Sequence, residues 1–152
     1  LSYTHPVLSC QEAKVLESCV LVDEAAEWAA MKLAGQGIAK HLVQDYAELR
    51  SPPEYLRILA LIGKGNNGGD ALIACGQLLA DFPRARVELI LTLPSEELRP
   101  LAARALQQLG GRVEVHQISD QNDVSEITQV LLDAAGSEGF HVCIDGVLGM
   151  AF

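Results

Sequence analysis

The chain has 152 residues, which predicts one domain, and its 49% of hydrophobic residues excludes a disordered tail. A formal net charge of −9 excludes sequence-independent binding to DNA or RNA, so we expect no nucleic-acid partner. The charge is compatible with a phosphorylated small molecule as ligand, because backbone N–H groups can bind a phosphate. No apolar run approaches the roughly 18 residues of a membrane span, so we also expect no membrane partner.

The segment ahead of Ser51 predicts two helices. Ser9 and Glu12 match a capping box ahead of a helix over residues 11–21. A second helix is predicted from Asp23 onward. Its apolar residues step by three and four, as on one helical face: Trp28, Met31, Ile38 and Leu42, with Gly35 between them. A glycine inside this face costs helix propensity, so we expect it to admit another backbone closely.

Strands and helices alternate after a break at Ser51-Pro52-Pro53. Short apolar runs predict strands over residues 56–62, 87–93, 113–118 and 140–144. Helices are predicted over residues 70–80, over 98–109 and after Asp123. This alternation predicts right-handed crossovers and a mostly parallel sheet. We therefore expect one domain over residues 1–152 with the Rossmann-like three-layer α/β/α fold, preceded by two N-terminal helices.

The commonest strand order for this pattern is 3-2-1-4, in which the first and fourth strands are neighbours. Ligands in such sheets bind outside the carboxyl ends of those strands, where the sheet reverses direction. A segment rich in glycine and polar residues follows each of the two strands: residues 63–70, Gly-Lys-Gly-Asn-Asn-Gly-Gly-Asp, and residues 145–149, Asp-Gly-Val-Leu-Gly. The sequence therefore predicts that these segments meet and form the ligand site.

The first segment contains Gly63-x-Gly65-x-x-Gly68, a formal match to the dinucleotide fingerprint that is weak by itself. A helix beginning near Gly69 would direct its N–H groups at a pyrophosphate. An ordinary NAD dehydrogenase is disfavoured, because no acidic residue follows the second strand. A Walker loop is disfavoured because no Gly-Lys-Ser/Thr ends the segment. The simplest alternative is a turn followed by a capped helix.

Residues 63–70 resemble the signature of the NAD(P)H-hydrate epimerases, also called the YjeF N-terminal domain family. Met-Lys-Leu-Ala-Gly at residues 31–35 resembles the family's Leu-Met-Glu-x-Ala-Gly. Ile-Asp-Gly-Val-Leu-Gly at residues 144–149 resembles its Asp-Ala-Leu-Leu-Gly-Thr-Gly. The two helices ahead of the first strand also match, so the resemblance covers nearly the whole chain.

The resemblance implies an isomerase that interconverts the (R) and (S) forms of hydrated NADH or NADPH, which are damaged cofactors. It also implies a potassium ion as cofactor, with Asn67 and Asp145 as ligands. Both side chains carry the hard oxygens that such cations prefer, although the sequence does not choose potassium over sodium or magnesium. The implied substrate contacts are Asn66, Asn67, Gly68, Gly69, Asp70, Gly149, Met150, Ala151 and Phe152.

No catalytic residue is assigned. The acid–base candidate of the family is an Asp ahead of a Pro-Ser-Gly motif, which these 152 residues lack, so we expect the domain to be incomplete at its C-terminus. Lys32 stands where the family has Glu, Ala71 where it has Gly, and Met150-Ala151 where it has Thr-Gly. These departures leave open a non-catalytic relative that binds a nucleotide or a protein. The resemblance also implies a homodimer, for which the apolar N-terminal helices are the candidate interface.

Neither cysteines nor histidines show metal-ligand spacing. The four cysteines are interpreted as small buried side chains in a reducing compartment, so the expected location is the cytoplasm: Cys10, Cys19, Cys75 and Cys143. The histidines are expected to be strand or surface residues: His5, His41, His116 and His141. Lys64 is equally compatible with a phosphate contact and with an exposed loop position.

Overall fold

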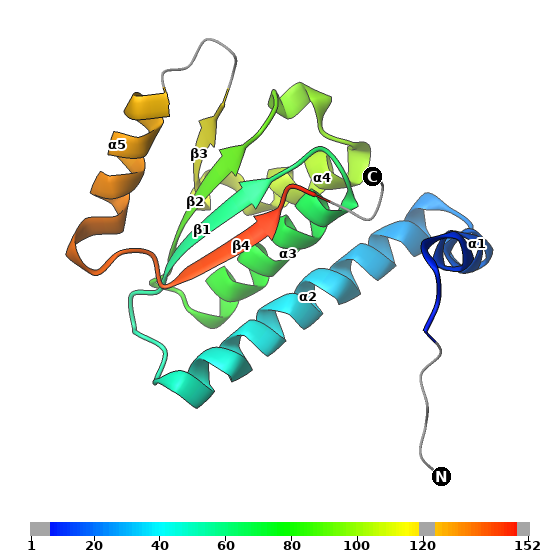
Figure 1. Cartoon of the computed structure of the whole chain (residues 1–152), viewed down its shortest axis with the longest axis horizontal. Coiled ribbons are helices and arrows are strands. Elements are labelled where there is room, and N and C mark those ends of the chain that lie inside the picture. The colour runs from blue at the N-terminus through cyan, green and yellow to red at the C-terminus, as the bar shows by residue number, and fades with distance from the viewer. Residues whose placement is uncertain (1–6, 119–123, 149–152) are drawn as a thin grey trace.

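The computed structural model describes residues 7–118 and 124–148 (Figure 1). Its helices are α1 (Cys10–Val20), α2 (Glu24–Leu49), α3 (Asn66–Asp81), α4 (Pro100–Leu109) and α5 (Val124–Ala135). Its strands are β1 (Arg57–Ile62), β2 (Arg86–Leu91), β3 (Glu114–Gln117) and β4 (Val142–Gly146). Three short 3₁₀ turns are η1 (Ser95–Glu97), η2 (Gly110–Arg112) and η3 (Gly136–Glu138). The predicted order of elements is confirmed.

The sheet has the order β3-β2-β1-β4, and every pairing is parallel, which confirms the predicted topology. Ile62 pairs with Leu91 on one side and with Gly146 on the other. The carboxyl ends of β1 and β4 therefore lie side by side. Because β2 lies on one side of β1 and β4 on the other, the strand order reverses between β1 and β4, the place where such sheets bind their ligands.

One face of the sheet carries the main core. Alternate residues of β1 and β2 point to the same side, as the two-residue period of a strand requires, and their side chains are buried: Ile58, Ala60, Ile62, Val87, Leu89 and Leu91. They pack with the buried face of α3, which includes Leu72, Cys75 and Leu78. Each fully buried Leu or Ile contributes roughly 1.5–3 kcal/mol. In Figure 1, α3 and α4 lie behind the sheet and α2 crosses below them.

The start of α3 differs from the prediction. The helix begins at Asn66 rather than near Gly69 or Asp70, with Gly65 as its N-cap. Asn and Gly have poor helix propensity, so the sequence favoured a turn here. Tertiary packing overrides that preference, because Gly68 and Gly69 are both buried. β4 also runs two residues beyond the predicted end, so that Asp145 lies inside the strand.

Helix α2 packs on α3 through Trp28, Met31, Gly35 and Ala39. The predicted face was wrong at Ile38, whose side chain is 39% exposed, because the buried stripe continues to Ala39 instead. The expectation for Gly35 is confirmed. A Cβ atom there would lie 2.6 Å from the carbonyl oxygen of Asp70 and 2.5 Å from Cβ of Ile73. Only a glycine lets the two helices approach this closely.

The interpretation of the cysteines as buried is confirmed for Cys75 and wrong for Cys10, Cys19 and Cys143, which are exposed. All four are free thiols. The two cysteines of α1 are exposed because that helix buries none of its residues. Cys143 alternates with the buried Val142 and Ile144, so it faces away from the core. No helix within the described residues is long and apolar enough to cross a membrane.

Candidate functional site

The two glycine-rich segments meet at the carboxyl ends of β1 and β4, as the sequence predicts. The backbone N–H of Gly63 donates to the carbonyl oxygen of Gly146 at 3.2 Å. A Cβ atom on Gly63 would overlap the carbonyl oxygen of Val147, and a Cβ on Gly68 would overlap that of Gly63. A Cβ on Gly146 would lie 2.8 Å from the carbonyl oxygen of Asn67. The glycines are therefore required because two loops and a helix start occupy one small volume.

Asn67 and Asp145 lie on the facing sides of this junction. The side-chain N–H of Asn67 donates to the carbonyl oxygen of Leu148. Oδ1 of Asp145 accepts a hydrogen bond from the backbone N–H of Val147 at 2.9 Å. These contacts orient both side chains, and they leave the amide oxygen of Asn67 and Oδ2 of Asp145 without a partner among the described residues. Both residues are exposed, so a ligand can reach those oxygens.

The first turn of α3 presents backbone donors at the same place. The first helical hydrogen bond runs from the N–H of Gly69 to the carbonyl oxygen of Gly65. The N–H groups before Gly69 have no acceptor within the helix, and Gly65 supplies no side-chain cap. These donors and the positive end of the helix dipole form a site for an anion. The sequence predicted that these donors would lie at a helix start near Gly69, three residues further along the chain than the observed start at Asn66.

Asp70 lies one turn into α3 and is half-buried. Burial raises the pKa of its carboxyl group to about 6. This carboxyl group therefore releases its proton closer to neutral pH than an ordinary aspartate does. Lys64 is exposed, and its carbonyl oxygen accepts a hydrogen bond from the N–H of Arg99 at 3.1 Å, which ties the loop to the start of α4.

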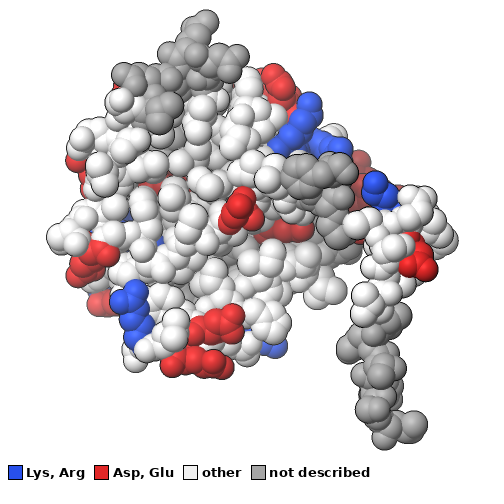
Figure 2. All heavy atoms as spheres, viewed as in Figure 1, with Lys and Arg blue, Asp and Glu red and all other residues white. Residues whose placement is uncertain are grey.

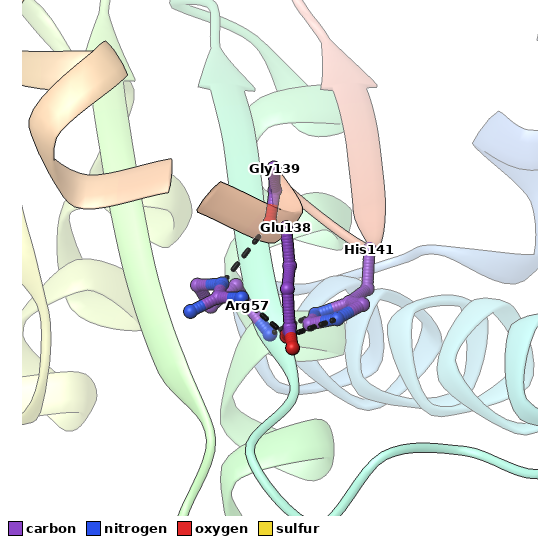
Figure 3. Close-up of polar contacts among 4 residues, drawn as sticks. All are labelled: Arg57, Glu138, Gly139 and His141. Atoms are coloured by element: carbon purple, nitrogen blue, oxygen red, sulfur yellow. Dashed lines mark hydrogen bonds and ion pairs between the residues drawn. The ribbon is translucent and has the colours of Figure 1, made fainter. Parts of the chain in front are cut away.

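A second polar cluster lies at the opposite end of β1 and β4 (Figure 3). The Nε of Arg57 donates to the carbonyl oxygen of Gly139 at 3.0 Å, and its Nη2 lies 2.7 Å from Oε2 of Glu138. Nδ1 of His141 accepts from the backbone N–H of Arg57. Sequence reasoning missed this cluster, because Arg57 lies more than eighty residues from the other three members and the four match no motif. The cluster joins the N-terminal ends of β1 and β4, at the opposite end of these strands from the glycine-rich loops.

A groove of about 940 Å³ runs between α2 and β4. Its lining is mainly apolar and includes Leu33, Ile38, Leu42, Tyr46, Val142 and Cys143. In Figure 2 the surface over this part of the molecule is largely uncharged. No sequence motif pointed to this groove, because its two walls come from opposite ends of the chain.

Four of the residues predicted to contact the substrate, Gly149, Met150, Ala151 and Phe152, lie outside the described residues. The other five all lie in the first turns of α3, beside the carboxyl ends of β1 and β4: Asn66, Asn67, Gly68, Gly69 and Asp70. Within residues 7–118 and 124–148, no three His, Cys, Asp or Glu side chains gather to hold a metal ion. His116 instead forms a 2.6 Å contact with Glu88 on the neighbouring strand.

The model of the family described as YjeF-related protein N-terminus matches residues 28–152, a span that holds both loops of the site. The chain belongs to this family.

The curated relatives carry two different names. Over 115 residues the chain is 33% identical to the chloroplastic pyridoxine/pyridoxamine 5′-phosphate oxidase 1 of Arabidopsis thaliana, covering 73% of this chain and 20% of that protein. Over 104 residues it is 36% identical to the bifunctional NAD(P)H-hydrate repair enzyme Nnr of Salinibacter ruber, covering 64% and 18%. The chain thus spans about a fifth of the length of these relatives.

A solved structure confirms the fold. The crystal structure of the yeast protein ynu0 (YNL200c) superposes with a TM-score of 0.71 over 97% of this chain and 58% of that one. The sequence identity is 21%, so the match shows the shared architecture alone. It includes the N-terminal helices, since nearly the whole chain is covered.

Proposed function

We propose that this chain binds hydrated NADH or NADPH at the junction of the two loops and interconverts the (R) and (S) forms. The observation that carries this proposal is the glycine junction itself, which brings the free backbone donors at the start of α3 close to the exposed residues Asn67 and Asp145. An anion site beside oxygen ligands suits a dinucleotide that carries a pyrophosphate. Family membership and the name of the Salinibacter relative support the same substrate.

In the proposed reaction the hydroxyl group on C6 of the hydrated ring leaves as water, and the ring nitrogen supplies the electron pair that forms an iminium. Water then adds to C6 from the other face and loses a proton, which restores the hydrate with the opposite configuration. The N–H groups at the start of α3 hold the pyrophosphate, and Asn66 to Asp70 position the nucleotide. Both steps require an acid–base group within about 3 Å of the hydroxyl. We assign that role to no described residue.

We further propose a potassium ion held by Asn67 and Asp145. The donor set fits a hard cation, since each side chain keeps one oxygen that no described residue engages. A bound ion would offset the negative charge of the pyrophosphate and of Asp145. The oxygens proposed to bind the ion are held in place by this chain's own hydrogen bonds, from Asn67 to the carbonyl oxygen of Leu148 and from the N–H of Val147 to Asp145.

The competing proposal is a relative that keeps the binding site without catalysis. Lys32 is the departure that favours it, because it places a cation where the family has an acid. Its Nζ lies 5.9 Å from the centroid of the Trp28 ring. Ala71, another departure, is buried within α3, where an alanine suits the helix.

The deciding measurement is the epimerisation of (R)-hydrated NADPH, with and without potassium, by the wild-type chain and by Asp145→Ala. Asp133→Ala is the matched control, since Asp133 is an exposed residue of α5. Turnover above the spontaneous rate that Asp145→Ala abolishes and Asp133→Ala retains is the expected result. Saturable binding without turnover would establish the competing proposal. If the chain shows neither binding nor turnover, both proposals are overturned.

A further inference from the structure

A second hollow, of about 220 Å³, lies where α2, α3 and α4 meet. It shares no residue with the glycine-rich loops. Gly76 forms part of its wall and lies ten residues beyond Asn66 on α3, which is roughly 15 Å at the rise of an α-helix. The hollow therefore shares no residue with the proposed nucleotide site, and its first lining residue on α3, Leu72, lies two residues beyond Asp70.

Its floor and its rim differ in chemistry. The floor is apolar. Ile73 and Gly76 are partly exposed in it, and the other apolar residues that line it are buried: Leu72, Ala105 and Leu109. The rim is polar and consists of the other lining side chains: Lys32, Gln36, Gln77, Gln108 and Arg112. Among the described residues, no Asp or Glu lines the hollow, although the chain holds 20 acidic and 11 basic residues. A lining with two cations and no acidic side chain makes this hollow electrostatically distinct from most of the surface of an acidic protein.

Several polar side chains of the rim have hydrogen-bond donors with no partner among the described residues. Nε of Arg112 donates to the carbonyl oxygen of Leu109 at 3.3 Å, which anchors the guanidinium and leaves its two terminal NH₂ groups without a partner among the described residues. The same holds for the side-chain amides of Gln36 and Gln108 within the described part of the chain. Gln77 donates to Asp81 at 2.9 Å and so is already engaged.

We propose that this hollow binds a small organic carboxylate whose apolar body rests on the floor. The planar fork of Arg112 matches the two oxygens of a carboxylate, and the amides of Gln36 and Gln108 supply further donors. The partly exposed side chain of Ile73 favours a hydrocarbon body over a bare inorganic anion. The volume is below that of pockets for drug-sized ligands, so the body is no larger than about one ring. This site is independent of the proposed epimerase activity.

The test uses benzoate as the probe, with benzamide as its uncharged counterpart and inorganic phosphate as an anion without an apolar body. Binding is followed by the backbone amide signals of Gly76 and Arg112 in NMR spectra. We expect saturable shifts with benzoate, at a dissociation constant on the order of 1 mM, and at least tenfold weaker binding of benzamide and phosphate. No saturable shift with benzoate, or equal binding of benzamide, would overturn the proposal.

Two variants locate the binding. Arg112→Gln should weaken benzoate at least tenfold, whereas Arg86→Gln removes the same charge from an exposed position outside the hollow and should leave binding within twofold. Gly76→Leu should abolish binding by filling the hollow, because a Cβ there meets only Cδ2 of Leu109, at 3.2 Å. Leu also favours a helix over Gly, so this variant should stay folded. An equal loss in Arg86→Gln, or unchanged binding in Gly76→Leu, would refute the site.

Discussion

The backbone N–H of Arg57 donates a hydrogen bond to Nδ1 of His141 with 3.0 Å between the two nitrogens, and so joins the N-terminal ends of β1 and β4 (Figure 3). An Nδ1 that accepts must be unprotonated, which places the proton of the neutral ring on Nε2. That nitrogen lies 3.8 Å from Oε2 of Glu138. The neutral ring is therefore the form that fits the fold.

We predict that this contact makes stability fall in mild acid. Burial, and next the charge of Arg57, lower the pKa of His141. Because the folded state then binds fewer protons than the unfolded state, the contribution is present above the unfolded pKa of about 6.5 and is lost as the pH falls below it. Urea unfolding should show that His141→Ala costs about 1 kcal/mol at pH 7.5, and less at pH 5. His41→Ala, at an exposed position, should change neither value, and an equal cost at both pH values would contradict the prediction.

Substitutions at the glycine junction should separate packing from flexibility. Gly68→Ala and Gly146→Ala force a Cβ against backbone atoms that cannot turn aside, and each should lower the free energy of unfolding by about 2–4 kcal/mol. Gly65→Ala is the control, since nothing lies within 4 Å of a Cβ at that N-cap and the cost should stay below about 1 kcal/mol. Equal costs at the three positions, measured by urea unfolding, would argue against the interlocked loops.

Asn67 should serve the site in two ways that substitution can separate. Asn67→Ala removes the donor to Leu148 and the oxygen proposed for the ion, so the affinity for hydrated NADPH should fall by about tenfold or more. Asn67→Asp keeps an oxygen, so the potassium dependence should persist while the loop anchor is lost. Asp81→Ala, at the exposed far end of the same helix, leaves both features intact and is the control. Calorimetric titration with and without potassium checks the set, and loss of the ion dependence in Asn67→Asp would count against the proposed ligand.

Asp70 should make stability decrease as the pH rises through the acid range. Its folded pKa of about 6 lies above the ordinary value of 3.8, so the folded state holds an extra proton between these two values. Stability is therefore greater below the window and declines across it as the pH rises. Asp70→Asn should abolish this decline and stabilise the fold at pH 7 by on the order of 1 kcal/mol, a small gain because the carboxyl group is only half-buried. If the decline in stability persists in Asp70→Asn, other titratable groups cause it and the prediction is wrong.

Much of the fold was predictable because it depends on local patterns. The apolar run of β1, the capping box at Ser9 and the glycines after α4 each specify an element through short-range rules. Alternation of these elements implied a parallel sheet, and the sheet implied a crevice at its carboxyl edge. The position of the glycine-rich loops at that crevice followed from strand order alone.

The sequence by itself determined the order of elements, the parallel sheet and the place of the glycine-rich loops, because helix and strand periodicity and the handedness of crossovers act over short spans of chain. Only the tertiary structure decided that α3 begins at Asn66, that Ala39 rather than Ile38 is buried, and that Cys143 faces outward. The Arg57–His141 contact and the hollow beside Gly76 belong to the same group. Each of these depends on packing between segments distant in the chain, and a local pattern carries no information about the partner on the other side.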